Sequence, residues 1–147
     1  GMAMNGLGAT LARAGRIDEA LPLLQDAVRL QPRLAEARSN LGIVLLQTGK
    51  AAEAIEQQRE ALRIRPDYAA AHVNLANALA STGNLTEAER HLQTGIRLDP
   101  SPWQPYYNLA HIQYQNGKVE AGRRLMQQAM ERAPDAATRM RIRNATR

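Results

Sequence analysis

Four prolines recur at a single interval and constrain the fold more than any other feature of the sequence. They stand 34 residues apart, at Pro32, Pro66, Pro100 and Pro134. A series of glycines precedes each proline by 17 residues, at Gly15, Gly49, Gly83 and Gly117. A fixed period of this length is typical of solenoids, in which similar helical units stack on one another. The chain of 147 residues therefore divides into the units 1–34, 35–68, 69–102 and 103–136, followed by a remainder at 137–147.

Each unit is predicted to contain two helices separated by the glycine. Glycine can adopt the left-handed conformation that ends a helix, and proline prevents the second helix from continuing into the next unit. Small residues recur at positions 8, 20 and 27 of the unit, and they allow the two helices to cross closely. Leu or Ile recurs around positions 7, 11, 24, 28 and 30, at the spacing of an apolar helix face. We expect an all-α fold with helices over 2–14, 17–31, 35–48, 51–64, 69–82, 85–98, 103–116 and 119–132.

The length of the unit, its glycine and proline, and its recurring small and apolar positions resemble those of the tetratricopeptide repeat (TPR) family. The resemblance covers residues 2–136. It implies a right-handed superhelical solenoid of four helix-turn-helix repeats, in which the first helices line a concave groove. The remainder at 137–147 is expected to form either a basic capping helix or the truncated start of a fifth repeat.

Asparagine recurs at the sixth position of three successive units, as Asn40, Asn74 and Asn108. It is a mediocre residue for a helix interior, so its recurrence at one place indicates a function. The surrounding segments EARSNLGIVLLQTGK, AAHVNLANALASTGN and PYYNLAHIQYQNGK are similar to the repeats of O-GlcNAc transferase and its bacterial relatives. In that family the matching asparagines hold a peptide backbone, and the resemblance implies this role for these three residues. The alternative is that each asparagine ties neighbouring helices together.

Positions 2, 5, 9, 12 and 13 of each unit are expected to face the groove, which becomes aromatic in the fourth unit. Tyr107, His111 and Tyr114 follow the spacing i, i+4, i+7 and therefore share one helix face. Residues 69–83 and 103–116 contain no charged side chain, which favours a neutral, extended peptide as the ligand. Tyr114 has the alternative role of a core residue. The predicted peptide-binding groove comprises Asn40, Asn74, Asn108, Asn77, Tyr107, His111 and Tyr114.

Catalytic chemistry finds little support in the sequence. The histidines His72, His91 and His111 show no metal-ligand spacing, and no nucleophile elbow or phosphate loop appears. We expect all three to be packing or surface residues, and we expect no enzyme activity, no cofactor and no bound metal. Positions 2 and 5 of the units hold neither Lys nor Arg, so the clamp that related repeats use for a terminal carboxylate is not expected.

Most of the positive charge lies in the tail. The net charge is +5, and the residues after 135 contribute four positive charges and no negative one, through Arg139, Arg141, Arg143 and Arg147. The near-neutral body argues against nucleic acid as a ligand. The sequence contains no Cys and no apolar run long enough to span a membrane. These features favour a cytoplasmic protein, with the periplasm as the alternative.

The pattern as a whole predicts a non-catalytic scaffold that binds a protein or peptide in its groove. One alternative is a substrate-selecting fragment of a larger O-linked glycosyltransferase-like protein. The other alternative is a TPR protein that associates with itself as a homo-oligomer, through an uncharged groove or through open repeat ends.

Overall fold

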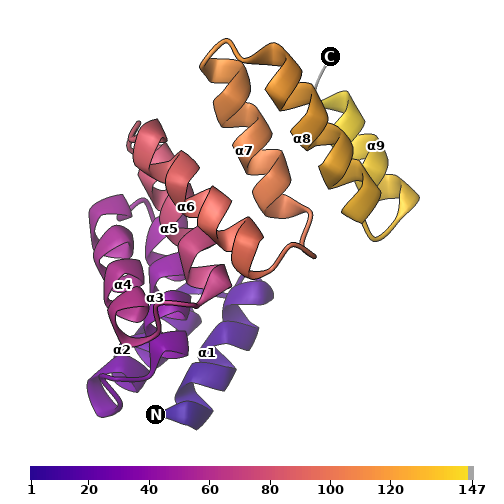
Figure 1. Ribbon diagram of the computed structural model, residues 1–147. Coiled ribbons are helices and arrows are strands. Elements are labelled where there is room, and N and C mark those ends of the chain that lie inside the picture. The colour runs from indigo at the N-terminus through magenta and orange to yellow at the C-terminus, as the bar shows by residue number, and fades with distance from the viewer. Residues whose placement is uncertain (146–147) are drawn as a thin grey trace.

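The computed structural model describes residues 1–145, so residues 146–147, including Arg147 of the basic tail, lie outside the described residues. Within 1–145 the chain forms nine α-helices and no strand. The helices are α1 (Met2–Arg13), α2 (Ile17–Leu30), α3 (Ala35–Gln47), α4 (Ala51–Ile64), α5 (Ala69–Ser81), α6 (Leu85–Leu98), α7 (Gln104–Gln115), α8 (Val119–Arg132) and α9 (Ala136–Asn144). They stack in chain order as an all-α solenoid (Figure 1). The first eight helices begin and end within one residue of the bounds that the period predicts.

The glycine of each unit ends the first helix in the left-handed conformation, as expected. Gly15, Gly49, Gly83 and Gly117 have φ angles of 78°, 80°, 82° and 73°. The residue after each glycine then donates its N–H to the carbonyl oxygen five residues earlier. These bonds measure 2.8–2.9 Å and join Arg16 to Leu11, Lys50 to Leu45, Asn84 to Leu79 and Lys118 to Gln113. The same helix-ending motif therefore closes the first helix in every unit.

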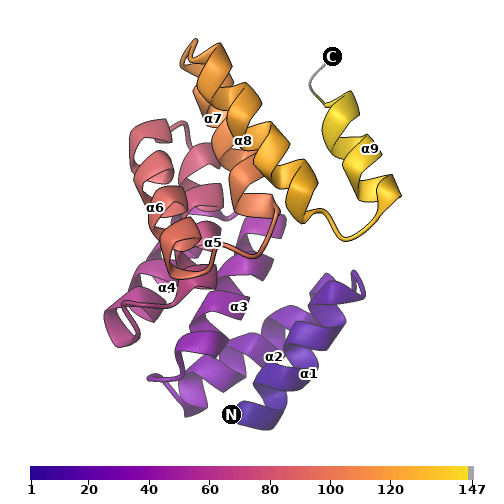
Figure 2. The ribbon, with the colours of Figure 1, turned by 45° about the vertical axis from the view of Figure 1, so that its right-hand side comes forward.

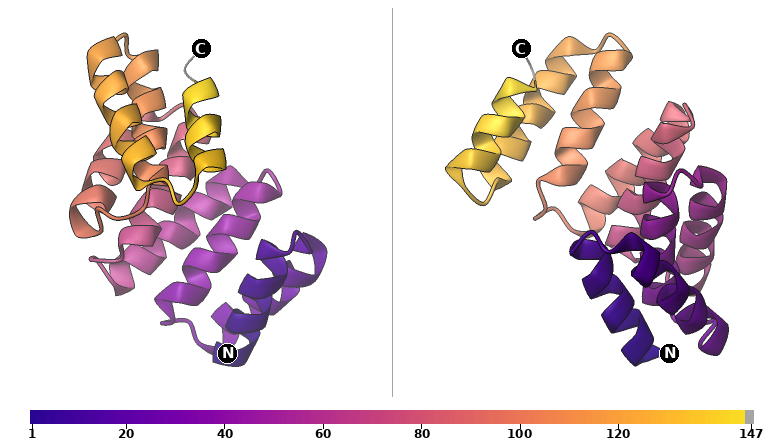
Figure 3. Two further views of the ribbon diagram at one scale, coloured as in Figure 1. Left: turned by 90° about the vertical axis from the view of Figure 1, so that its right-hand side faces the viewer. Right: turned by 180° about the vertical axis from the view of Figure 1, so that it is seen from behind.

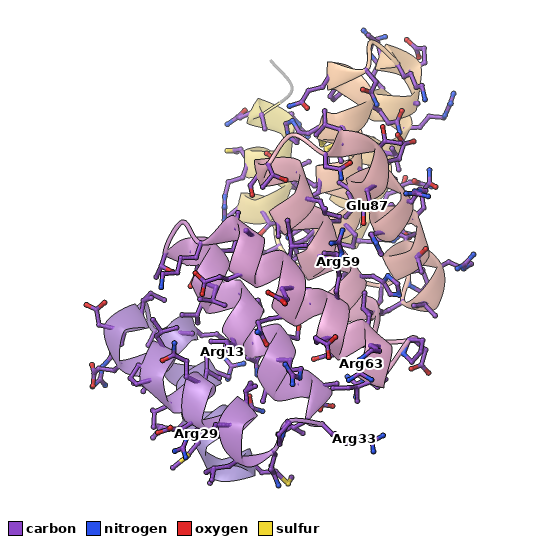
Figure 4. The ribbon with its side chains drawn as sticks, turned by 90° about the vertical axis from the view of Figure 1, so that its left-hand side faces the viewer. Arg13, Arg29, Arg33, Arg59, Arg63 and Glu87 are labelled. Carbon is purple, nitrogen blue, oxygen red and sulfur yellow. The ribbon has the colours of Figure 1, made fainter. Side chains whose placement is uncertain are left out.

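Apolar residues at positions 7 and 10 bury each internal first helix against the preceding unit. Leu41 and Val44 of α3 share a core cluster with Ala20 and Leu24 of α2. The same arrangement recurs between α6 and α7, among Ala88, Leu92, Leu109 and Ile112. The second helices α2, α4 and α6 form one side of the solenoid (Figure 4), and the first helices α1, α3 and α5 face the opposite side, on which α8 and α9 lie in front of α7 (Figure 3, left panel). We call the surface of the first helices α1, α3, α5 and α7 the inner face, and the turned view in Figure 2 shows how the successive helix pairs follow one another.

A hydrogen bond at the fourth position ties each internal first helix to the turn before it. Arg38, His72 and Tyr106 contact the carbonyl oxygen of the proline six residues earlier, at 2.7, 2.9 and 3.0 Å. The three side chains differ in chemistry, but each can supply one proton donor. For His72 this requires the tautomer that carries its proton on Nε2, which the carbonyl partner favours.

The ninth helix begins one residue earlier than the period predicts. Arg139 donates to the carbonyl oxygen of Ala133 at 3.4 Å, again across six residues, whereas the period would place this pair at 140 and 134. The early start follows from the cap, because the Asp135 carboxylate accepts a hydrogen bond from the backbone N–H of Thr138 at 2.6 Å. Aspartate in this position is among the strongest helix-capping residues.

The early start also decides which side chain of α9 is buried. Ile142 is the seventh residue of α9, as Leu41 is of α3, and only 1% of it is exposed. It shares a core cluster with Met126 and Ala129 of α8. Helix α9 thus docks on α8 in the manner of a first helix, at the far end of the solenoid from α1 (Figure 3).

Candidate functional site

Several charged side chains lie on the second helices. On the outer side, Arg29, Arg59, Arg63 and Glu87 belong to the second helices α2, α4 and α6 (Figure 4). The hydrogen bond that Arg59 donates to Glu87 at 3.0 Å lowers the pKa of that carboxyl. The first helices α5 and α7 carry no charged residue. A ligand beside these two helices therefore meets no formal charge from them.

Two of the recurring asparagines connect a first helix to the fifth position of the unit before it. Asn40 Nδ2 donates to Asn5 Oδ1 at 2.9 Å, and Asn74 Nδ2 donates to Ser39 Oγ at 3.1 Å. Because Ser39 is only 1% exposed, the expectation that its position faces the groove is wrong for this residue. Position 5 lies between successive first helices in these two units.

The third asparagine makes the same connection one helical turn further along. Asn108 Nδ2 donates to Asn77 Oδ1 at 2.7 Å, and Asn77 stands at the ninth position of its unit. The fifth position is Val73, whose side chain has no acceptor. Asn77 borders two cavities at this junction, one of about 320 Å³ shared with Asn74 and one of about 310 Å³ shared with His111. The junction between the third and fourth units therefore differs from the other two.

The amide oxygens of Asn40, Asn74 and Asn108 accept no hydrogen bond from the described residues. Each of these asparagines also lines a cavity; the one at Asn40 measures about 190 Å³ and lies between α1 and α3. The NH2 group of each amide thus ties neighbouring helices, while its oxygen accepts no hydrogen bond from the described residues. The geometry leaves room for both roles that the sequence raised.

The predicted residues Tyr107, His111 and Tyr114 form a row along one face of α7, which Trp103, the residue before the helix, extends. Its ring centroids are 5.8 Å apart for Trp103 and Tyr107, 4.5 Å for Tyr107 and His111, and 6.4 Å for His111 and Tyr114. All three contacts are edge-to-face, a favoured arrangement of aromatic rings. Tyr114 also packs against the core cluster of the fourth unit, over Gly122 of α8. Its ring therefore makes the contacts expected of a core residue, the alternative role that the sequence raised for Tyr114.

One nitrogen in this row has no partner. His111 Nε2 is buried and makes no hydrogen bond within the described part of the chain. His111 lines the cavity of about 310 Å³ together with Asn77, Asn108 and Gln115 on its polar side. A buried polar atom without a partner is unfavourable by about 1–3 kcal/mol, so this nitrogen is a cost to the folded state.

Sequence reasoning missed a contact between two histidines. His72 Nδ1 and His91 Nδ1 lie 2.9 Å apart, although the residues belong to α5 and α6. They occupy the fourth and twenty-third positions of their unit. In the preceding unit these positions are Arg38 and Gln57, which also form a hydrogen bond, at 3.1 Å. The signal in the sequence was therefore this recurring pair of positions and not the spacing of the histidines.

Over residues 1–145, no three or more Cys, His, Asp or Glu side chains are grouped so that they could hold a metal ion. None of the described helices has the length and apolar character that crossing a bilayer requires. The inner face offers asparagine amides and aromatic rings as its contact groups.

The fold is shared with several solved structures of low sequence identity. TTC0263, a thermophilic TPR protein in Thermus thermophilus, is 23% identical, with a TM-score of 0.84 over 98% of this chain and 80% of that chain. MamA 41-end from Desulfovibrio magneticus RS-1 is 20% identical, with a TM-score of 0.76 over 88% and 73% of the two chains. The first TPR of Spaghetti (RPAP3), bound to HSP90 peptide SRMEEVD, is 18% identical, with a TM-score of 0.74 over 79% and 92%.

A search of the curated proteins found no match to this sequence. Models of the tetratricopeptide repeat family, in contrast, match three overlapping stretches, at residues 1–67, 49–107 and 104–136. These stretches together span the four units that the proline period defines. The chain therefore belongs to the tetratricopeptide repeat family.

Proposed function

We propose that this chain is a non-catalytic scaffold that binds a neutral, extended peptide along the inner face of its first helices. The observation that carries the proposal is the set of three asparagine amide oxygens, each beside a cavity and each without a partner among the described residues. An amide oxygen accepts a hydrogen bond from a backbone N–H. A row of such oxygens binds the main chain of a peptide whatever its sequence.

Selectivity in this scheme comes from the fourth unit. Tyr107 and Tyr114 flank His111, and aromatic side chains commonly carry much of the energy of an interface. A peptide with one aromatic or apolar side chain would match this end of the groove.

The composition of the groove also sets the charge of the preferred ligand. The peptide bound to the Spaghetti (RPAP3) repeat, SRMEEVD, contains three acidic residues. This chain has no Lys or Arg at the second and fifth positions of its units, which are Met2, Glu36, Ala70, Gln104, Asn5, Ser39, Val73 and Tyr107. We therefore expect acidic peptides to bind this chain more weakly than neutral ones.

The test distinguishes the contribution of the asparagine amide oxygen to peptide binding from that of the hydrogen bond that its NH2 group donates to the neighbouring helix. A peptide selected from a random phage-displayed library on the wild-type chain serves as the probe, and its Kd is measured by fluorescence anisotropy. The double variant Asn40→Ala and Asn74→Ala loses both the helix tie and the amide oxygen. The matched variant Asn5→Ala and Ser39→Ala removes the acceptors of these ties and keeps the amide oxygens of Asn40 and Asn74.

We expect the first double variant to raise the Kd about tenfold, the loss of two neutral hydrogen bonds, and the second to raise it less than about threefold. Equal losses in the two variants would assign the asparagines to helix packing alone. An unchanged Kd in the first variant, with its helical circular dichroism intact, would remove the peptide role altogether.

A further inference from the structure

The first unit exposes a face that every later unit buries. At the seventh position Leu7 is 53% exposed, whereas the later leucines are 1–5% exposed: Leu41, Leu75 and Leu109. At the tenth position Thr10 is exposed, whereas the later residues are 0–4% exposed: Val44, Ala78 and Ile112. At the third position Ala3 is exposed, and Ala37 and Ala71 are fully buried. We call Ala3, Leu7 and Thr10 the leading face.

The internal junctions show what covers such a face. Leu41 and Val44 pack in one cluster with Ala20 and Leu24, which lie on the second helix of the preceding unit. The fourth unit presents the equivalent face on α8, through Met126 and the neighbouring Ala129 and Ala133. We call these three residues the trailing face. The chain therefore carries both halves of a repeat junction, one at each end.

Helix α9 covers the trailing face, but with little buried surface of its own. Ile142 is its one buried residue, whereas α3, α5 and α7 each bury five or more. Met140 of α9 is 62% exposed, and the side chains of Arg139 and Arg141 are exposed as well. The cap is therefore held by one apolar side chain and a few polar contacts, which makes it a weak competitor for this site.

We propose that α9 is a displaceable cap and that the leading face of a second copy of this chain takes its place, so that copies join head to tail. The contact would continue the solenoid with the same positions that build its internal junctions. It is a heterologous interface, so it extends as an open chain of copies unless the rotation between them closes a ring. It lies at the ends of the solenoid and does not rest on the proposed peptide groove.

The leading face lacks the polar tie of the internal junctions. The sixth position of the first unit is Gly6, where the later units have asparagine. The new contact is therefore apolar and lacks the hydrogen bond that Asn40 donates to the preceding unit. We expect association to be reversible and dependent on protein concentration.

The experiment uses the full chain in three forms. Ile142→Lys removes the apolar contact of the cap and should open the trailing face. Leu7→Lys combined with Ile142→Lys opens the trailing face and blocks the leading one. Met140→Lys is the matched control, since it makes the same change on the exposed side of α9.

Multi-angle light scattering is expected to show oligomers that grow with concentration for Ile142→Lys, and monomers for the combined variant and the control. Mixing the combined variant with the wild-type chain should yield a one-to-one dimer, because the wild type offers its leading face to the opened trailing face. We expect this pair to bind at least about tenfold more tightly than the wild type binds itself.

Oligomers of the combined variant as large as those of Ile142→Lys would overturn the proposal, because the leading face would then have no part in them. A monomeric Ile142→Lys chain, or a mixture that forms no dimer, would overturn it equally and leave the leading face to another occupant. If Lys at 142 unfolds the fourth unit in circular dichroism, Ile142→Ser replaces it in the same three measurements with the same criteria.

Discussion

His91, which contacts His72, is a proton-sensitive residue of the third unit. When His72 Nε2 donates to the Pro66 carbonyl, its Nδ1 is the acceptor and His91 Nδ1 must donate the bond of 2.9 Å between them. Burial lowers the pKa of His91, and the neighbouring His72 lowers it further; Glu87 opposes this, while Arg90 and Arg59 add to it. The folded chain therefore holds His91 neutral at a pH where the unfolded chain would protonate it.

The sign of the pH effect follows from this difference in proton binding. Since the pKa of His91 is lower in the folded state, the unfolded state binds more protons as the pH falls below about 6.5, and folding stability declines. We expect a lower Tm at about pH 5.5 than at about pH 7.5, measured by circular dichroism. His91→Gln, which copies Gln57 of the preceding unit, should reduce that difference. An equal pH dependence in the two proteins would contradict the assignment to this pair.

Gln58 departs from the repeat pattern, and its structural role could be predicted only in part from the sequence. It stands where the other units have Leu24, Leu92 and Met126, so the sequence identifies it as unusual. Its structural role depends on the neighbouring helix, because its Nε2 donates to the Ser39 carbonyl at 2.8 Å while its Oε1 is buried without a partner among the described residues. That bond could not be predicted, since it is set by the crossing of α3 and α4.

At the scale of helices, the glycine of α8 is explained by the tyrosine that packs on it. A Cβ atom added to Gly122 would lie 2.5 Å from Cε1 of Tyr114. In the second unit the residue equivalent to Gly122 is Ala54, and the residue equivalent to Tyr114 is Leu46. The unit with the larger alanine therefore has the smaller leucine packed against it. The sequence predicted a small residue at this position, where the two helices cross closely, but it did not predict the tyrosine ring as the partner, because this contact depends on how the helices pack.

Gly122→Ala should therefore destabilise the chain by about 1–3 kcal/mol through overpacking, although alanine favours helices. In a Tyr114→Leu background, which copies the second unit, the same change should be neutral or stabilising by up to about 1 kcal/mol. Urea unfolding of the wild type, both single variants and the double variant measures the coupling. Additive effects of the two substitutions would show that the ring does not constrain residue 122.

The helix bounds were predictable because two local signals mark them in every unit. Gly49 can take a φ of 80° without strain, and Pro66 cannot continue a helix, so both boundaries are decided by single residues. The early start of α9 was not predicted, since the period places its first helix residue after Ala136. There the cap at Asp135 decides the boundary, and a strict period hides it.

The sequence predicted where the residues of the candidate site lie on the helices, but it did not predict their hydrogen-bond partners. The period correctly places Asn40 and Asn74 on neighbouring first helices, but whether an amide bonds to a ligand or to a helix depends on distances between units. Asn108 donates its hydrogen bond to Asn77 and not to the fifth position of the third unit, because that position is Val73, which has no acceptor. The effect of this one side chain becomes visible only when the units are stacked.

For the whole molecule, the two cavities beside α7 indicate that the fourth unit opens more readily than the central ones. They measure about 310 and 320 Å³ and both lie between the third and fourth units. In a solenoid each unit is stabilised mainly by its neighbours, so an incompletely filled junction lowers the cost of local unfolding. We expect hydrogen exchange to be fastest in α9, slower in α7 and α8, and slowest in α3 to α6.

Filling one cavity tests this order. Ala80 lines the cavity of about 310 Å³, and the equivalent residue of the second unit is Leu46. Ala80→Leu should slow the exchange of α7 amides, read by mass spectrometry of peptides from residues 104–115. Ala52→Leu, at an exposed site on α4, is the matched control and should leave α7 unchanged. Exchange in α7 that stays the same or accelerates in Ala80→Leu would show that the cavity does not limit this junction.

The bond to the carbonyl six residues back is made by an arginine, a histidine, a tyrosine and again an arginine. Because the carbonyl requires only one donated proton, this position can drift among chemically unlike residues while the architecture is preserved. Arginine stays charged throughout the physiological range and tyrosine stays neutral, whereas histidine changes between the two. A substitution at this position can therefore change the charge of one unit while the tie to the preceding turn is kept.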